Sequence, residues 1–167
     1  MKIKREALVD VYITESLLLL LKKKEYKDIS ITEICKKAGV TRMSFYRNFE
    51  SKEDILFKKV RDVTDCFLKK SAISYKNDTL SSYFAKLFTH MKQQAELCDA
   101  LNKAGLMHMI KDEFDRVFLN TYRQEYGEYK SAFLAGGIYN VFLFWYTNNC
   151  RDNPEELAKR LDDILMK

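Results

Sequence analysis

Apolar residues recur along most of this chain at the three- and four-residue spacing of amphipathic helices, and no segment alternates as a β-strand does. The clearest apolar face consists of Leu80, Tyr83, Phe84, Leu87, Phe88 and Met91. Only five glycines and one proline interrupt the pattern. The spacing predicts about nine helices, near residues 4–24, 30–38, 41–48, 52–71, 80–91, 96–103, 106–125, 128–149 and 154–166. We therefore expect an all-α fold.

Residues 28–56 contain the start and stop signals of closely spaced helices. The hydroxyl side chains that suit the N-cap position are Ser30, Thr41 and Ser51. Glu33 and Asp54 follow two of these caps by three residues, as in a capping box. Gly39 lies where the first short helix ends, because the turn that follows needs a residue tolerant of positive φ. This punctuation predicts a helix-turn-helix unit.

The helix predicted at residues 41–48 has one apolar side and one polar side. Phe45 and Phe49 are expected to point into the core. The other side presents Arg42, Met43, Ser44, Tyr46, Arg47 and Asn48. Two short helices at a steep angle, of which the second presents basic and small side chains, suit insertion into a DNA major groove. The sequence predicts a module that binds double-stranded DNA; the alternative is an ordinary pair of packed helices.

The positive charge of the chain is concentrated near its N-terminus. Residues 1–52 hold 12 Lys and Arg against 7 Asp and Glu, whereas residues 53–167 hold 17 of each. A local basic excess attracts the phosphate backbone of nucleic acid and releases its condensed counterions. Charge alone would suit a membrane surface equally well, but the pattern of residues 41–48 favours DNA.

Few residues of the chain suit catalysis or metal binding. The four cysteines lie far apart, at Cys35, Cys66, Cys98 and Cys150. Such spacing indicates reduced thiols in a cytoplasmic protein. A zinc site of Cys98 with His90 and His108 is the alternative. Because the chain has only two histidines and no nucleophile or metal-ligand spacing, we expect no enzyme, no metal site and no cofactor.

One apolar stretch is long enough to raise the question of a membrane span. Residues 131–150 carry no charge, and their length suffices to cross a bilayer. Gly136, Gly137 and Asn140 dilute the apolar character, and charged residues flank the stretch closely. A helix that is apolar on nearly all sides also suits packing within the protein on one side and against a partner on the other. We therefore expect no membrane segment.

These motifs together resemble the tetracycline-repressor (TetR) family of bacterial transcription regulators. In the N-terminal part, the resemblance covers about residues 5–60 and is carried by ITEICKKAGVT, FYRNF and SKEDIL. In the C-terminal part, AGGIYNVFLFWYTNN followed by NPEELAKRL resembles the ending of such regulators from low-GC Gram-positive bacteria. The resemblance implies a homodimer with a helix-turn-helix head and a helical body that often binds a small molecule.

The resemblance also implies roles for individual residues of the head. Arg42, Met43 and Ser44 match positions that face base edges, and an arginine there can form a forked pair with guanine. Backbone phosphates are the implied partners of Thr32, Tyr46, Arg47, Asn48 and Lys52. Thr41 matches the position that caps the recognition helix. Met43 departs from the small residue usual at its position, and its side chain can instead pack on thymine methyl groups.

We expect a DNA-binding domain at residues 1–50 and a regulatory and dimerisation domain at residues 51–167, connected by the helix that starts near Lys52. One head contacts too little DNA for regulatory affinity, so two copies about 34 Å apart are expected on a palindromic operator. The candidate dimer contacts are Gly136, Gly137, Asn140, Phe144, Trp145, Leu157 and Leu161. For Trp145 the alternative is a place in the core of one subunit.

A small hydrophobic effector is expected to enter the helical body and to change the separation of the two heads. The candidate pocket residues are Phe67, Tyr83, Phe88, Met91, Met107, Phe114 and Tyr122. Aromatic and methionine side chains at helical spacing are also typical of plain core. The prediction is a ligand-responsive regulator, most commonly a repressor. The alternative is an adaptor of the same fold that pairs with another regulator and binds DNA weakly or not at all.

Overall fold

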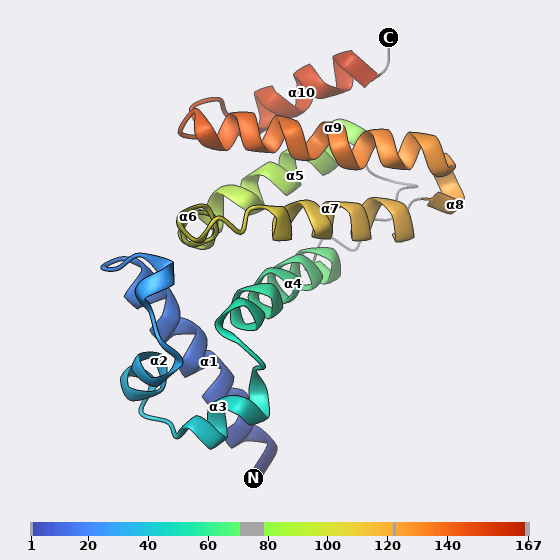
Figure 1. Ribbon diagram of the computed structural model, residues 1–167. Coiled ribbons are helices and arrows are strands. Elements are labelled where there is room, and N and C mark those ends of the chain that lie inside the picture. Colours follow the sequence, from blue (N-terminus) through green and yellow to red (C-terminus); the bar gives the residue numbers. More distant parts are fainter. Residues whose placement is uncertain (1, 71–78, 122, 166–167) are drawn as a thin grey trace. The chain divides into compact units, whose positions relative to one another are not determined.

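The computed structural model describes residues 2–70, 79–121 and 123–165, and these form ten α-helices and one 3₁₀ helix without a strand (Figure 1). The helices are α1 (Lys2–Leu21), η1 (Tyr26–Asp28), α2 (Ile31–Ala38), α3 (Arg42–Asn48), α4 (Lys52–Lys70), α5 (Leu80–Gln93), α6 (Ala95–Ala104), α7 (His108–Thr121), α8 (Arg123–Tyr126), α9 (Glu128–Thr147) and α10 (Pro154–Leu165). The all-α prediction is confirmed. The helix predicted at residues 106–125 corresponds to α7 and the four-residue α8, which accounts for the extra helix.

The described residues divide by packing into two compact units. The first unit comprises Met1–Asp62 and Glu96–Met109, and the second comprises Val63–Ala95 and Ile110–Lys167. Helix α4 is continuous from Lys52 to Lys70, so its first half belongs to one unit and its second half to the other.

In the first unit, α1 packs against α2 and α3. Leu17 of α1, Ile34 of α2, Phe45 of α3 and Ile55 of α4 are fully buried. Burial of one such side chain stabilises a fold by roughly 1.5–3 kcal/mol. The apolar positions that predict these helices are therefore also the positions that fill the core of this unit.

The predicted helix caps are confirmed. Ser30 Oγ accepts a hydrogen bond from the Glu33 amide at 3.2 Å, and Thr41 Oγ1 accepts one from the Ser44 amide at 3.1 Å. Helix α2 ends at Gly39, whose φ of +67° lies in the left-handed region that favours glycine. Across this turn, the Val40 amide donates to a carbonyl in the last turn of α2 at 3.0 Å. Local sequence is thus sufficient to set the turn between α2 and α3.

In the second unit, α10 packs on α5, and aromatic rings fill the space between helices. Phe88 of α5 meets Trp145 of α9 edge to face, with 5.5 Å between ring centroids. Phe114 of α7 stacks on Phe142 of α9 at 6.3 Å. Aromatic pairs of this kind add about 0.5–1.5 kcal/mol beyond the area they bury. The core of this unit is therefore largely aromatic.

The end of α1 and the segment between α4 and α5 can be compared with the helix bounds predicted from the sequence. Helix α1 ends at Leu21 instead of near Lys24, because the amides of Lys23 and Lys24 both turn back to the Leu20 carbonyl. The polar residues 74–79 separate the helices predicted at 52–71 and 80–91, and all but Thr79 lie outside the described residues. Over the ranges that the structure describes, no helix combines the length and the apolar character that a bilayer crossing requires.

Candidate functional site

Helix α3 presents one face to solvent and buries the other. Phe45 is fully buried, and Phe49, which follows the helix, is 3% exposed. On the opposite face, Arg42 and Arg47 are exposed, and Met43 and Tyr46 expose 69% and 51% of their surface. The predicted division of this helix into a buried apolar face and an exposed polar face is therefore confirmed.

Arg42 and Tyr46 are neighbours on this exposed face. The Arg42 guanidinium carbon lies 5.9 Å from the centroid of the Tyr46 ring, within the range of a cation–π contact. The Tyr46 ring in turn packs edge to face on the buried Phe45, with 5.3 Å between centroids. The guanidinium is thus held near the surface of α3 by a ring that is itself anchored in the core.

Short hydrogen bonds order the polar side chains of the same helix. The hydroxyls of Thr41 and Ser44 lie 3.0 Å apart, and Asn48 Nδ2 donates to the Ser44 carbonyl at 2.7 Å. Ser44 and Asn48 are both half-buried. These two side chains are more enclosed than the flanking arginines, whereas Thr32, in the first turn of α2, is exposed.

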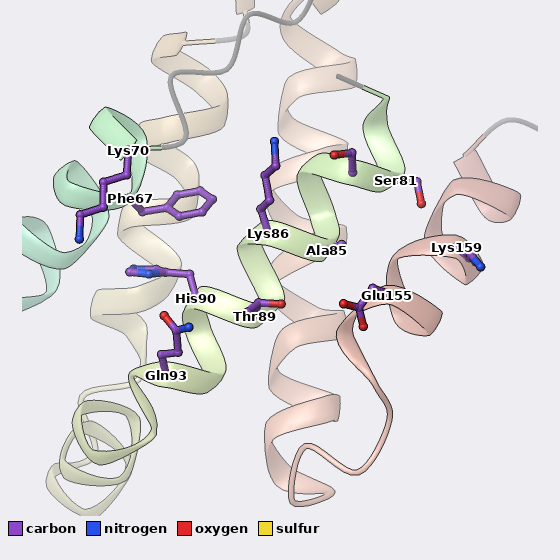
Figure 2. Close-up of a pocket in the computed structure, with 11 residues that line it drawn as sticks. Phe67, Lys70, Ser81, Ala85, Lys86, Thr89, His90, Gln93, Glu155 and Lys159 are labelled. Carbon is purple, nitrogen blue, oxygen red and sulfur yellow. The ribbon is translucent and has the colours of Figure 1, made fainter. Parts of the chain in front are cut away.

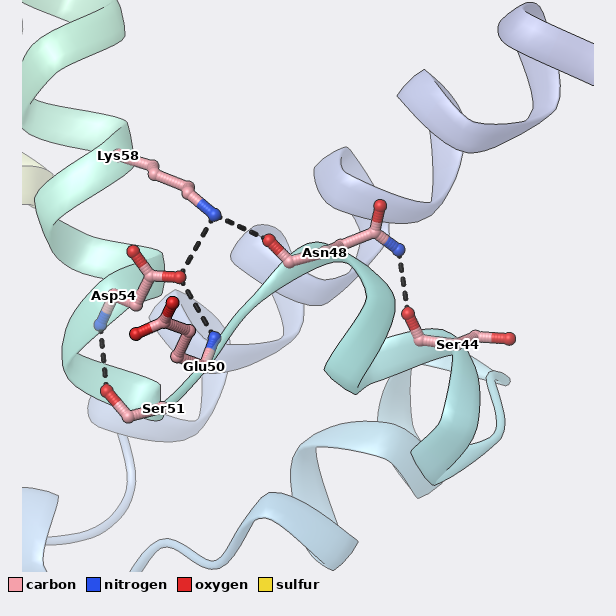
Figure 3. A network of polar contacts seen from close by, with 6 residues as sticks. All are labelled: Ser44, Asn48, Glu50, Ser51, Asp54 and Lys58. Carbon is pink, nitrogen blue, oxygen red and sulfur yellow. Dashed lines mark hydrogen bonds and ion pairs between the residues drawn. The ribbon is translucent and has the colours of Figure 1, made fainter.

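A polar network connects the end of α3 to the start of α4 (Figure 3). Lys58 Nζ donates to the Asn48 carbonyl at 2.6 Å and pairs with the Asp54 carboxylate at 3.0 Å. Asp54 Oδ2 accepts the Glu50 amide at 3.0 Å, and the Asp54 amide donates to Ser51 Oγ at 3.1 Å. A cation at the last carbonyls of α3 also complements the negative end of the helix dipole.

Sequence reasoning recognised Ser51 and Asp54 as a cap but missed Lys58. The signal available was the four-residue spacing from Asp54 to Lys58, which places the two charges on one face of a helix. The network bonds the backbone at the end of α3 to side chains of α4. It therefore constrains the angle between the two helices.

Lys52, a predicted phosphate contact, also has hydrogen-bond partners within the first unit. Its ammonium donates to the carbonyls of Tyr26 and Ile29, at 2.7 and 3.1 Å, and lies 4.1 Å from the centroid of the Tyr26 ring. Burial raises the pKa of the Tyr26 phenol, and the neighbouring Glu53 carboxylate raises it further, so the ring stays neutral. Lys52 therefore joins α4 to the segment around η1, and its contact with phosphate stays a prediction.

Replacing Lys52 with methionine is expected to lower the free energy of unfolding by about 1–3 kcal/mol, because two carbonyls lose a charged donor. Urea unfolding followed by circular dichroism measures the change. The matched control is Lys36→Met on the exposed end of α2, for which we expect a change below about 0.5 kcal/mol. If Lys52→Met leaves stability unchanged but weakens DNA binding, the Lys52 ammonium contacts a DNA phosphate and its structural role is minor.

The residues predicted to line a ligand pocket are only partly brought together. Tyr83, Phe88 and Phe114 are 2%, 0% and 7% exposed and pack in the core of the second unit, so their place in a pocket wall stays a prediction. Met91 is half-buried on α5, Met107 belongs to the first unit, and Tyr122 lies outside the described residues. Phe67 of α4 lines an open hollow beside α5. Periodicity marks the apolar face of a helix but does not distinguish a filled core from a cavity wall.

The residues predicted for a dimer contact separate into two groups. Trp145 and Leu161 are 2% and 6% exposed, and the Trp145 indole donates to the Asp152 carbonyl at 2.9 Å. Both therefore belong to the core of their own unit, which for Trp145 is the alternative that the sequence left open. The exposed or partly exposed members are Gly136, Gly137, Asn140, Phe144 and Leu157.

Tyr129 and Phe133, which are not among the predicted dimer contacts, extend the exposed part of α9. They are 91% and 64% exposed, and Phe144 is 68% exposed. Together with Gly137 and Asn140 they follow a spacing of three or four residues and share one side of α9, which we call the α9 stripe. The side opposite carries the buried residues of the helix.

The described residues contain no group of three His, Cys, Asp or Glu side chains placed to hold a metal ion. Cys98 is buried in the first unit, whereas His90 belongs to the second. In the first unit, the exposed side of α3 carries the two arginines Arg42 and Arg47.

Two family models match the chain. The model described as bacterial regulatory proteins of the tetR family matches residues 13–58, which include α2 and α3. The model described as a transcriptional regulator C-terminal region matches residues 78–167, which is more than half of the chain. The two matches cover the helix-turn-helix and most of the helical body.

A relative of the chain is also described as a transcriptional regulator. The uncharacterized HTH-type transcriptional regulator YxbF of Bacillus subtilis (strain 168) is 21% identical over an alignment of 173 positions, which covers 93% of this chain and 44% of YxbF. The chain thus spans less than half the length of that relative.

Solved structures share the fold. A TetR transcriptional regulator from Streptococcus agalactiae 2603V superposes with a TM-score of 0.68 at 20% identity, over 95% of this chain and 94% of its own. The regulator FadR of Bacillus subtilis, in complex with stearoyl-CoA, gives a TM-score of 0.61 at 17% identity, over 93% and 96%. With its helix-turn-helix, its capped recognition helix and both family matches, the chain belongs to the TetR family of DNA-binding transcriptional regulators.

Proposed function

We propose that this chain is a homodimeric, ligand-responsive repressor that binds a palindromic operator through α3. The observation that carries the proposal is the exposed side of α3, where Arg42, Met43, Tyr46 and Arg47 face solvent opposite the buried Phe45. A helix presented in this way by a helix-turn-helix enters the major groove of DNA. Residues 1–50 act as the DNA-binding domain and residues 51–167 as the regulatory and dimerisation domain.

The side chains of this surface divide into those that contact bases and those that contact phosphates. Arg42 pairs with a guanine, Met43 packs on thymine methyl groups, and Ser44 bonds a base edge. Phosphates are contacted by Thr32, Tyr46, Arg47 and Asn48. Lys52 contributes through the backbone at the start of α4, since its ammonium is bound to the carbonyls of Tyr26 and Ile29.

The α9 stripe is the proposed contact between two subunits. Three large, exposed apolar side chains on one side of a helix are unusual for a surface that meets only water. Aromatic residues of this kind are enriched in the centres of protein interfaces. A pair of α9 helices, with α10 beside each, would form a four-helix bundle about a twofold axis.

Gly136 and Gly137 support this assignment. Glycine in the middle of a helix costs roughly 1 kcal/mol relative to alanine. A Cβ added at either position would meet nothing within 4 Å, so packing within the subunit does not require glycine here. Close approach by a helix of a second subunit would account for both.

Ligand binding in the body changes DNA binding by the head through α4, which belongs to both units. In the second unit, Arg116 of α7 pairs with Asp65 of α4 at 2.7 Å and with the nearly buried Glu113 at 2.7 Å. A ligand that shifts α7 or the end of α4 therefore acts on the helix that carries the head. FadR of Bacillus subtilis, which has a similar fold, was solved with stearoyl-CoA, and this supports a small effector with an apolar part.

The second candidate is an adaptor that uses the same fold to pair with another regulator. Met43 favours it, because a 69% exposed apolar side chain in the centre of the contact face also suits a protein partner. The adaptor would bind DNA weakly and without sequence preference.

A salt titration of DNA binding distinguishes the two candidates. We expect fluorescence anisotropy with DNA from upstream of its own gene to show sequence-dependent binding. Raising the salt from about 50 to about 200 mM is expected to weaken that binding roughly a hundredfold or more, because several phosphate contacts release counterions. A scrambled duplex of the same length is the control. Equal, weak binding to both duplexes would favour the adaptor.

A further inference from the structure

An open hollow of about 570 Å³ lies along α5 in the second unit, with α4 on one side and α10 on the other (Figure 2). Sites for small organic molecules usually measure about 300–1,000 Å³. The hollow is therefore large enough for a compact organic ligand, and among the described residues it shares Phe67 with the pocket predicted from the sequence.

Small side chains on α5 account for the hollow. The helix buries Tyr83, Phe84 and Phe88 on its core side. On the side that faces the hollow it carries Ser82, Ala85 and Thr89, spaced by three and four residues. Because these side chains are short, α4 and α10 flank α5 without filling the space above it.

The charge around the hollow is predominantly positive. Lys70 of α4, Lys86 of α5 and Lys159 of α10 line it, against the single carboxylate of Glu155. The three lysines come from the three helices that border the hollow, so their flexible side chains make its rim positive. Ser81, in the first turn of α5, also lies on the wall, so the positive end of that helix dipole adds to the field.

The wall next to α4 is apolar and flat. The rings of Phe67 and His90 stack with 5.0 Å between centroids and 28° between planes, and Figure 2 shows them side by side. His90 Nε2 is buried and has no hydrogen-bond partner among the described residues. Burial lowers the pKa of His90, although a hydrogen bond to the backbone of Val63 opposes this. A neutral imidazole leaves Nε2 as an acceptor for a donor on a ligand.

We propose that the hollow binds a small organic anion, whose apolar body packs on Phe67 and Ala85 and whose carboxylate, sulfonate or phosphate head lies among Lys70, Lys86 and Lys159. The occupant is the effector of the regulator, a statement that depends on the proposed function. Phe67 and Lys70 belong to the half of α4 that is continuous with the head, so the anion acts directly on the helix that carries α3.

Binding of anilinonaphthalenesulfonate to the full-length protein tests the site, since this probe combines an aromatic body with a sulfonate and fluoresces when bound. The test variant is Lys70→Met with Lys86→Met. The matched control is Lys69→Met with Lys92→Met, which removes the same charge from exposed positions of the same two helices that do not line the hollow. We expect the test variant to bind the probe about tenfold more weakly and the control to bind within about twofold of the parent.

Competition by three small molecules separates charge from apolar area. Phenylpropionate, phenylpropanol and phenylpropylamine share a body and differ only in the charge of the head. The anion is expected to displace the probe at concentrations at least about tenfold lower than the alcohol or the amine. Equal probe affinity of both double variants, or equal competition by the three molecules, would overturn the anion site.

A DNA titration with and without phenylpropionate separates failure of this site from failure of the proposed function. Lysine-dependent anion binding in a protein that binds no DNA would support the site and overturn the DNA-binding regulator. Sequence-dependent DNA binding without lysine-dependent anion binding would support the DNA-binding regulator and overturn the anion site. Lysine-dependent anion binding that leaves operator affinity unchanged would overturn the effector role.

Discussion

Replacing Arg42 with alanine is expected to weaken operator binding by roughly thirtyfold to ten-thousandfold, because a forked arginine–guanine pair contributes about 1–3 kcal/mol in each of two half-sites. The fold is expected to persist, since Arg42 is exposed and its recorded contact is with the neighbouring Tyr46 ring. Fluorescence anisotropy against operator and scrambled duplexes measures the effect. Most of the loss is expected on the operator.

Two matched variants show whether geometry or charge causes that loss. Arg42→Lys keeps the positive charge but removes the fork, and we expect it to lose most of the preference for the operator while it retains binding to scrambled DNA. Lys37→Ala removes one charge from the exposed end of α2 and is expected to weaken both complexes modestly and equally. If Arg42→Ala behaves like Lys37→Ala, Arg42 contacts phosphate and the proposed base contact is wrong.

Changing Phe133 and Phe144 together to aspartate is expected to convert the dimer to a monomer and to weaken operator binding by roughly a hundredfold to ten-thousandfold. Both side chains are about two-thirds exposed in the subunit, at 64% and 68%, so the subunit fold does not depend on them. An ionised carboxylate in an apolar interface costs several kcal/mol when it lacks a partner. A single head also loses the high effective concentration that the second head provides.

Light scattering after size exclusion measures the mass, and anisotropy measures the operator affinity. The control is Leu19→Asp, which places the same charge on a half-exposed leucine of α1, outside the α9 stripe, and is expected to remain dimeric. A double variant that remains a dimer would reject the α9 stripe as the subunit contact. A parent protein that is monomeric at micromolar concentration would reject the homodimer itself.

The parts of the candidate site that could be predicted are those that depend on near neighbours in the chain. Ser30, Gly39 and Thr41 each act on backbone groups within five residues, and all three have the geometry that their positions predict. The core face of α3 at Phe45 follows from the same local period. Such signals are readable because helix ends always leave unpaired amides and carbonyls that nearby side chains satisfy.

The hydrogen-bond partners of Lys52 and the burial of Trp145 could not be predicted, because both follow from packing. Lys52 bonds carbonyls 26 and 23 residues earlier in the chain, at a place where family resemblance alone implies a phosphate. Helix α9 is apolar on nearly all sides, so its periodicity does not say which side faces inward. Packing places Trp145 in the core and leaves Phe133 and Phe144 in solvent.

The amino-acid sequence alone thus determined the all-α class, the capped helix-turn-helix and its basic exposed side, since each arises from residues a few positions apart. Tertiary structure alone decided the partners of Lys52, the exposed stripe on α9 and the hollow that gathers Lys70, Lys86 and Lys159. The physical reason is distance along the chain. Charges and rings from helices up to 89 residues apart, such as Lys70 and Lys159, share one space only after α4, α5 and α10 have packed.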